Sequence, residues 1–415
     1  MGTRILRDTT VAPNPLPLAP AARKTPFFRF DGSVDFILLV IMIIFVVFGM
    51  LMVYSASWDY SFYWKGDSMY QFNRQLIWMA LGITLATALS FIDYQHLRKL
   101  ALPIMFITIG LLSVVLFSHE TGRALSKGSM QPSEFAKVIT IIYLSVWMDS
   151  KREQLHDVSW GLIPLGVIIG FICALIFLQP DNSAAFTVLL LGGLLFFLGG
   201  GELKQILFVA VMVVLVVVFV VKVTSSGQSR MEQFLLGLQD LTKAGYHISY
   251  SFKAIVNGGL FGVGIGRATT KLIGLPFAPT DSIFAVIAEE LGLFGAAGTV
   301  LLYVALVWRG LRIAYKAPDM LGSLIAAGLT FWIGIEAVIN ILVMVGLAPF
   351  AGNALPFISY GGSSLVSSFI AIGILMSVSR QSETKTEFEE WSNSVASIDM
   401  RGRNRRRSIS RISRP

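Results

Sequence analysis

The residues best placed to do chemistry are acidic and basic side chains that interrupt long apolar stretches. Asp281 follows the proline-containing segment 275–279 and precedes a long apolar run. One interpretation is that Thr280 or Asp281 caps the helix that begins there, since a capping side chain accepts hydrogen bonds from free backbone N–H groups. The other is that the Asp281 carboxylate faces a watery cavity and acts as a general base. Arg267 and Lys271 lie close in sequence and are candidates to neutralise a phosphate leaving group.

A second set of polar residues opens another apolar run. Glu134 and Lys137 are three residues apart, so they share one face of a helix. In water such a pair is commonly a surface ion pair, but at a bilayer edge ionisable side chains tend to face a cavity or each other. We therefore interpret Gln131, Glu134 and Lys137 as lining a polar groove. Asp181 lies in a Gln-Pro-Asp-Asn turn, for which a turn-forming role is the default.

Four more polar residues fall inside apolar runs. Glu289 and Glu290 are adjacent, and at least one of them needs a buried partner, so a structural hydrogen bond is the favoured interpretation. Glu336 and Asn340 are four residues apart and form a polar stripe on one helix face. Such a stripe is costly in lipid, which favours a helix partner, a substrate or a proton as its contact.

Composition places these residues in a membrane protein. Of the 415 residues, 54% are hydrophobic and 14% are charged, whereas soluble domains have about 45–50% and about 25%. A soluble single domain is excluded, and the single cysteine, Cys173, excludes an intrachain disulfide. The net charge of +8 is concentrated at the two ends, which is typical of a membrane protein and not of a nucleic-acid-binding one. The glycine-rich stretch 262–266 lacks the strand context of a dinucleotide site, so close backbone packing is favoured there.

About ten apolar runs are long enough to cross a bilayer. A hydrocarbon core of about 30 Å requires about 20 mostly apolar residues in a helix. The sequence therefore predicts an all-α polytopic membrane protein with spans near 34–54, 75–92, 99–118, 134–150, 160–178, 183–200, 204–223, 284–311, 320–346 and 360–379. The run at 134–150 is the least secure of these because it is short and amphipathic.

Three regions follow from these spans: a polar arm at 1–33, a transmembrane domain at 34–380 and a basic tail at 381–415. Lys and Arg gather in the arm, in the tail and in the loops on their side of an even number of spans, which predicts cytoplasmic N- and C-termini. The segment 224–283, between the seventh and eighth spans, is then a large extracytoplasmic loop. It is too long for a passive connection, so we expect interfacial or re-entrant helices in it, including one at 246–254.

In this order along the chain, these residues resemble the FtsW/RodA family of SEDS (shape, elongation, division and sporulation) proteins. The resemblance extends from about residue 54 to about residue 379 and is carried by the motifs QPSEFAK (131–137), QPD (179–181), GVGIG (262–266), TDSIFA (280–285), EELG (289–292) and LPFISYGGSS (355–364). It implies that Ser359, Gly361 and Gly362 of the last motif are structural or cavity-lining. That motif and the long tail favour the FtsW-like branch over the RodA-like branch.

The resemblance implies a peptidoglycan glycosyltransferase that polymerises lipid II at the outer face of the bacterial cytoplasmic membrane during division or elongation. In this family the aspartate that matches Asp281 is essential, and it would deprotonate the acceptor sugar hydroxyl. The residues that match Glu134 and Lys137 line the same cavity. A polyprenyl pyrophosphate would leave, and its charge calls for a divalent cation (Mg²⁺ or Mn²⁺) or a basic residue. Candidates for the basic residue are Arg123, Arg267 and Lys271.

The implied partners are a class B penicillin-binding protein that performs transpeptidation, other divisome or elongasome membrane proteins, and glycan linked to polyprenyl pyrophosphate. Two alternatives stay open. One is a flippase for lipid-linked precursors, which would use intramembrane polar groups such as Glu336. The other is a division scaffold without catalysis, which departures from the family motifs favour: Arg123 is not followed by the usual tryptophan, and His247 replaces a usual glutamine.

Overall fold

A computed structural model describes residues 34–117, 131–240 and 243–382, and every regular element in these ranges is helical. The predicted arm at 1–33, most of the tail and Arg123 lie outside the described residues. The main helices are α1 (Phe36–Lys65), α2 (Tyr70–Phe91), α3 (Leu97–Phe117), α4 (Pro132–Ser150), α5 (Ile163–Phe177), α6 (Asn182–Leu198), α7 (Leu203–Val223), α8 (Ser225–Gln239), α9 (Tyr246–Gly258), α10 (Thr270–Ile273), α11 (Ile283–Lys316), α12 (Met320–Met344) and a C-terminal helix, Gly362–Ser382.

The ten predicted spans correspond to α1 to α7, α11, α12 and the C-terminal helix. Within the described ranges, eight helices are long and apolar enough to cross a membrane. The other two of the ten are α6, which has only 17 residues, and α4, which has 19 residues and a polar first turn. The prediction of a polytopic all-α fold is therefore confirmed. Helices α8, α9 and α10 occupy the segment between α7 and α11, and α9 covers the helix expected at 246–254.

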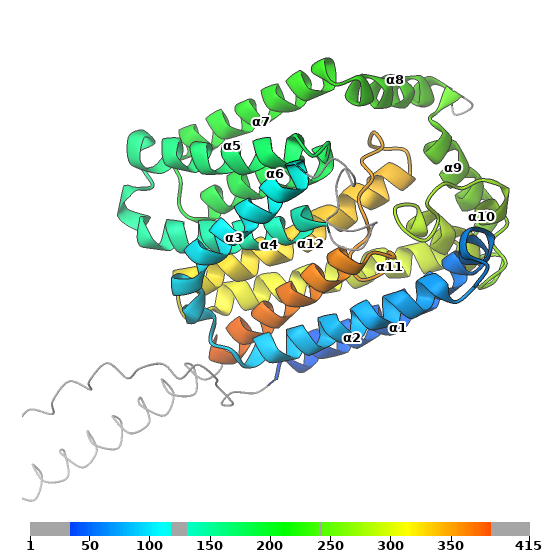
Figure 1. The fold of residues 1–415 in the computed structure, drawn as a ribbon, viewed down its shortest axis with the longest axis horizontal. Coiled ribbons are helices and arrows are strands. Elements are labelled where there is room, and N and C mark those ends of the chain that lie inside the picture. Colours follow the sequence, from blue (N-terminus) through cyan, green and yellow to red (C-terminus); the bar gives the residue numbers. More distant parts are fainter. Residues whose placement is uncertain (1–33, 118–130, 241–242, 383–415) are drawn as a thin grey trace, which may run out of the picture.

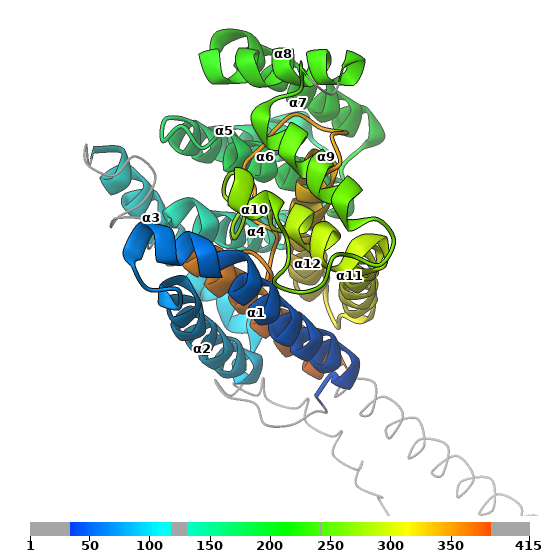
Figure 2. The ribbon, with the colours of Figure 1, turned by 90° about the vertical axis from the view of Figure 1, so that its right-hand side faces the viewer.

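Successive long helices run back and forth along the bundle, so its two ends carry different parts of the chain (Figure 1). At one end, α1 begins beside the last turns of the C-terminal helix. There Arg309 Nη2 is 2.8 Å from Asp35 Oδ2, and Ser379 Oγ donates to the same carboxylate at 3.0 Å. Helices α8, α9 and α10 lie at the opposite end (Figure 1). Figure 2 shows α7 and α8 together at one edge of the bundle.

Helix α12 is the central helix of the bundle. It packs against α4, α6, α9 and α11, and its Trp332 is fully buried. Glu336 and Asn340 lie on the faces of α12 that meet other helices and are both buried inside the protein, whereas Val338 on another face is exposed. The polar stripe predicted from their spacing thus faces neighbouring helices and not lipid.

Helix α11 is broken at Gly292, where a φ of 69° and a ψ of −166° interrupt the helical backbone. The glycine-rich loop 258–266 fills this break. Its Val263 N–H donates to Glu289 O at 3.0 Å, and on the other side of the break the Leu293 N–H donates to a loop carbonyl at 2.9 Å. Backbone groups that the break frees are thereby paired, as buried peptide groups must be.

The close approach between this loop and α11 requires glycine. A Cβ on Gly258 would lie 2.0 Å from Ala288 O, and a Cβ on Gly262 would lie 2.2 Å from Glu290 O. No side chain fits at such distances from backbone atoms. The glycine-rich stretch is therefore a packing element, as the sequence predicts.

Replacing Gly258 with alanine is expected to lower the free energy of unfolding by about 1–3 kcal/mol, because overpacking against fixed backbone atoms forces the loop away from α11. The measurement is thermal unfolding of the purified protein. Gly298→Ala is the matched control, since Gly298 lies on α11, the helix that the loop contacts, and no atom is within 4 Å of the added Cβ. Equal stability of the two variants would contradict the packing role.

Candidate functional site

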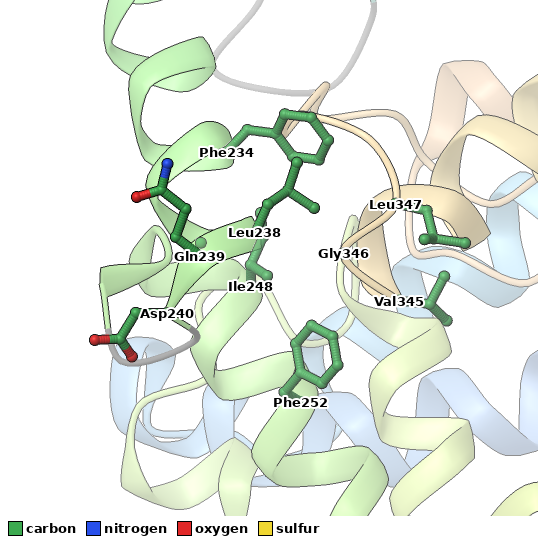
Figure 3. Close-up of a pocket in the computed structure, with 10 residues that line it drawn as sticks. Phe234, Leu238, Gln239, Asp240, Ile248, Phe252, Val345, Gly346 and Leu347 are labelled. Carbon is green, nitrogen blue, oxygen red and sulfur yellow. The ribbon is translucent and has the colours of Figure 1, made fainter.

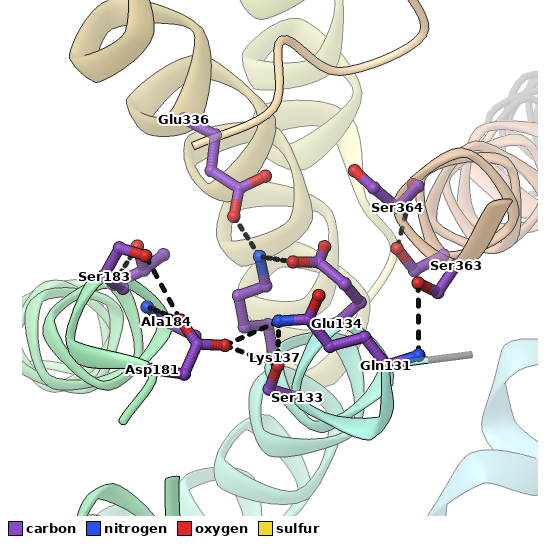
Figure 4. Close-up of polar contacts among 12 residues, drawn as sticks. Gln131, Ser133, Glu134, Lys137, Asp181, Ser183, Ala184, Glu336, Ser363 and Ser364 are labelled. Carbon is purple, nitrogen blue, oxygen red and sulfur yellow. Dashed lines mark hydrogen bonds and ion pairs between the residues drawn. The ribbon is translucent and has the colours of Figure 1, made fainter. Parts of the chain in front are cut away.

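Lys137 of α4 lies at the centre of a buried ionic cluster (Figure 4). Its ammonium is 2.9 Å from Glu134 Oε1 and also bonds to Glu336 Oε1 of α12. The side chains of Lys137 and Glu336 are each only 4% exposed. The sequence places Glu134 and Lys137 on one helix face, and packing of α4 against α12 adds Glu336 from 199 residues away. The cluster, defined as these three residues, contains two acids and one base.

A network around Asp181 fixes the first turn of α4. Asp181 Oδ2 accepts from Gln131 Nε2 at 2.7 Å and from Ser133 Oγ at 2.8 Å. The Gln131 backbone N–H donates to Ser363 Oγ at 3.3 Å, so the network reaches the C-terminal helix (Figure 4). The starts of α6 and of the C-terminal helix thus fix the first turn of α4, which carries Glu134.

Asp281 lies just before α11, at the end of the bundle that carries α8 to α10. Ser282 occupies the N-cap position of α11, and its side chain makes no capping hydrogen bond. The Thr280 hydroxyl donates to Phe277 O at 3.1 Å. The interpretation that Thr280 or Asp281 occupies the cap of this helix is therefore wrong. Asp281 instead lines a narrow pocket with the end of α12 and the loop 350–353. In this conformation the pocket is too tight to hold a water molecule.

Asn340 fixes the backbone of this pocket on two sides. Its Nδ2 donates to Asp281 O at 2.8 Å and to Asn353 O at 2.6 Å. Asn340 lies one helical turn beyond Glu336 on the same face of α12. The Asp281 pocket and the Lys137 cluster are therefore about one turn of α12 apart and form one polar region inside the bundle.

The segment 355–362 fixes the residues that precede Asp281. Ser359 Oγ donates to Thr280 O at 2.6 Å and accepts from the Leu355 N–H at 2.7 Å. The remaining hydrogen bonds run from Tyr360 N to Pro279 O (2.8 Å), from Gln75 Nε2 to Ser359 O (3.1 Å) and from Gly361 N to Gln75 Oε1 (3.3 Å). A Cβ on Gly362 would lie 2.5 Å from the Trp78 indole nitrogen, so a glycine is needed where α2 approaches. No sequence pattern pointed to Gln75.

Glu289 and Glu290 bind the segment before α11. Glu290 is within 3.0 Å of Lys271 Nζ and accepts from Ser55 Oγ at 2.6 Å. Glu289 accepts from the Thr269 backbone N–H at 3.1 Å and from the Thr270 hydroxyl. These contacts tie the loop to α11 and to α1.

Of the basic residues predicted to bind phosphate, Arg267 and Lys271 do not line the Asp281 pocket, and Arg123 lies outside the described residues. The Lys271 side chain is 3% exposed and holds the Glu290 carboxylate, while Arg267 is exposed on the loop. Their contact with phosphate stays a prediction. Sequence proximity to Asp281 was misleading here because the loop turns Lys271 toward Ser55, whose carbonyl accepts from it at 2.8 Å.

Residues outside the predicted set stand beside the pocket. Arg230 of α8 donates to Phe350 O at 3.2 Å, and its guanidinium lies 5.5 Å from the Phe350 ring. The same ring stacks on His247 at 4.1 Å. Burial and the nearby Arg230 charge lower the pKa of His247. Arg230 lies in a polar stretch of the sequence (224–233), and no local sequence pattern there indicates a binding residue.

The donor atoms around this region do not form a metal site. Within the described ranges, no three His, Cys, Asp or Glu side chains gather into a group that could hold a metal ion. Mg²⁺ is usually held by one or two carboxylates together with substrate phosphates, so a role for Mg²⁺ or Mn²⁺ stays a prediction.

Comparisons with known sequences agree with one another. A family model named for FtsW, RodA and SpoVE, and described as "Cell cycle protein", matches residues 35–384. A Trichlorobacter lovleyi protein named "Probable peptidoglycan glycosyltransferase FtsW" is 37% identical over 83% of this chain and 93% of its own length. Stage V sporulation protein E of Bacillus subtilis is 33% identical over 84% of this chain and 98% of its own.

Solved structures show the same helical arrangement. A chain from a peptidoglycan synthase complex that coordinates polymerization and crosslinking matches with a TM-score of 0.69 and 26% identity, covering 84% of this chain and 98% of that chain. The rod shape determining protein RodA of Thermus thermophilus matches with a TM-score of 0.61 and 25% identity, covering 84% and 97%.

Proposed function

Because the chain belongs to the FtsW/RodA/SpoVE family, we propose that it is a multi-pass membrane glycosyltransferase that polymerises lipid II into peptidoglycan strands. The observation that carries this function is Asp281, a carboxylate in a pocket whose backbone is held by Asn340 and Ser359. A general base must be held within hydrogen-bond reach of the proton that it removes. The relatives' names supply the reaction, and Asp281 in its pocket supplies the general base that the reaction needs.

The reaction balances with Asp281 as the base. The acceptor sugar hydroxyl gives its proton to the Asp281 carboxylate while its oxygen attacks the anomeric carbon of the donor sugar. The bond from that carbon to the pyrophosphate oxygen breaks, and the prenyl pyrophosphate leaves with the electron pair. The Lys137 cluster lies one level deeper and fixes α4 against α12, which sets the shape of the polar region that the sugars would occupy.

We propose cytoplasmic termini and an outer pocket for this chain. The Lys and Arg distribution supports this orientation, and α8 to α10 lie at the end of the bundle opposite the start of α1 (Figure 1). With the pocket on the outer side, Asp281 would meet lipid II in the outer leaflet.

The orientation predicts how single cysteines react in a Cys173→Ala background. Asp67→Cys, in the exposed turn between α1 and α2, is expected to react with a membrane-impermeant thiol reagent in intact spheroplasts. Glu153→Cys, in the exposed turn between α4 and α5, is expected to react only after the membrane is opened. The measurement is mass labelling of the protein, and the reverse pattern would overturn the proposed orientation.

We propose a class B penicillin-binding protein transpeptidase as the partner. The support is the similarity to a chain of a complex in which polymerization and crosslinking are coordinated. The FtsW name carried by several relatives favours a division role over elongation. Depletion of the protein is then expected to give filamentous cells, whereas rounded cells would indicate elongation.

Reconstitution in liposomes with lipid II and this partner tests the function. A polymerase yields glycan strands. A flippase would instead move lipid II across the bilayer without forming glycan, and the Glu336→Gln variant would lose this transfer. If a correctly folded protein shows neither activity with its partner present, the remaining interpretation is a non-catalytic scaffold.

A further inference from the structure

A second pocket, of about 570 Å³, lies between α8, α9 and the turn that follows α12 (Figure 3). Its volume falls within the roughly 300–1,000 Å³ typical of small-molecule sites. Two polar residues that line it, Gln239 and Asp240, point away from its centre (Figure 3). The apolar side chains around it are Phe234, Leu238, Ile248, Phe252, Val345 and Leu347. We refer to it as the apolar pocket.

The apolar pocket and the Asp281 pocket share a wall at the end of α12. Val343 and Met344 line the Asp281 pocket, and the next residues of the chain, 345–347, line the apolar pocket. A ligand in the apolar pocket would therefore lie next to the residues that line the Asp281 pocket.

Arg230 stands at the junction between the two pockets. It lies on α8 one turn before Phe234, which lines the apolar pocket. Its Nη1 donates to the carbonyl of Phe350, which lines the Asp281 pocket. A carboxylate, a guanidinium and an apolar cavity thus follow one another in space.

We propose that the apolar pocket binds the isoprenoid units next to the pyrophosphate of a lipid-linked sugar, while Arg230 binds the pyrophosphate itself. The inference rests on the proposed function, since the spatial order of the three features matches the covalent order of sugar, pyrophosphate and prenyl chain. A guanidinium suits phosphate oxygens because it offers a planar set of N–H donors. The apolar walls remove the first isoprenoid units from water.

Ligand binding by the full-length protein in nanodiscs tests the inference, with undecaprenyl pyrophosphate and chain-free inorganic pyrophosphate as probes. Leu238→Asp is expected to weaken undecaprenyl pyrophosphate binding at least about tenfold, or about 1.4 kcal/mol, and to leave inorganic pyrophosphate unchanged. Leu235→Asp is the matched control: both leucines are exposed on α8, and only Leu238 lines the pocket. Arg230→Gln is expected to weaken both probes.

Unchanged binding of undecaprenyl pyrophosphate by Leu238→Asp would overturn the inference, and so would an equal loss in Leu235→Asp. If a phospholipid chain or a segment of a partner protein occupies the apolar pocket, Leu238→Asp would leave undecaprenyl pyrophosphate binding unchanged. Failure of the proposed function is read separately with Asp281→Asn. Full polymerisation by that variant refutes the catalytic proposal, whereas the dependence of prenyl pyrophosphate binding on Leu238 reports on the apolar pocket alone.

Discussion

The Asp281→Asn variant is expected to polymerise lipid II about 10²–10⁴-fold more slowly than the wild type, the range that loss of a general base typically produces. Asparagine keeps the shape of the side chain but cannot take the proton of a sugar hydroxyl. The hydrogen bond from Asn340 reaches the backbone carbonyl of residue 281 and not its carboxylate. The pocket should therefore keep its geometry while the chemistry is lost.

Glycan formation in liposomes with the partner transpeptidase measures this effect. Asp67→Asn is the control, because Asp67 is an exposed aspartate at the same end of the bundle. Thermal unfolding of both variants should stay close to that of the wild type. Full activity of Asp281→Asn, or an equal loss in the control, would refute Asp281 as the base.

The Lys137→Met variant is expected to lose about 3–5 kcal/mol of stability, the cost of removing one partner from a buried ion pair. Glu134 and Glu336 would then face each other without the ammonium that lies between them. Glu336→Gln should cost less, because Lys137 keeps Glu134 as its counter-charge. Thermal unfolding of the purified protein measures both changes, and activity should fall with Lys137→Met as α4 separates from α12.

A triple variant separates charge from packing. Lys137→Met combined with Glu134→Gln and Glu336→Gln removes every charge of the cluster, and replacing a complete buried ionic group with uncharged residues is often close to neutral. It should regain most of the stability that Lys137→Met loses. If it is as unstable as the single variant, packing and not unpaired charge sets the cost.

The spans could be predicted from the sequence because a continuous run of apolar residues is a local property of the chain. Glu134 and Lys137 could be placed together because residues three apart share one face of a helix. The ends of the helices were predicted less accurately. Helix α1 continues to Lys65, beyond the expected 34–54, because its last turns are aromatic and polar and not continuously apolar. The break at Gly292 was also hidden, since its cause is the backbone of a loop that packs against it.

Parts of the site arise only when distant segments meet. Glu336 reaches Lys137 across 199 residues, and Gln75 reaches Ser359 across 284. No periodicity encodes such a meeting. Asp281 was identified from its place before a long apolar run and from the family resemblance, whereas Arg230 became visible only when α8 was placed over Phe350.

The break at Gly292 divides α11 into two helical pieces. The piece that follows Asp281 directly is bonded through its Glu289 carbonyl to the loop 258–266. The piece after the break is bonded to the same loop through the Leu293 N–H, and it is anchored at its far end through Arg309 and Asp35. The loop therefore bridges the break. A displacement of the piece that carries Arg309 is transmitted through the loop to the piece that follows Asp281, so the two pieces of α11 move together.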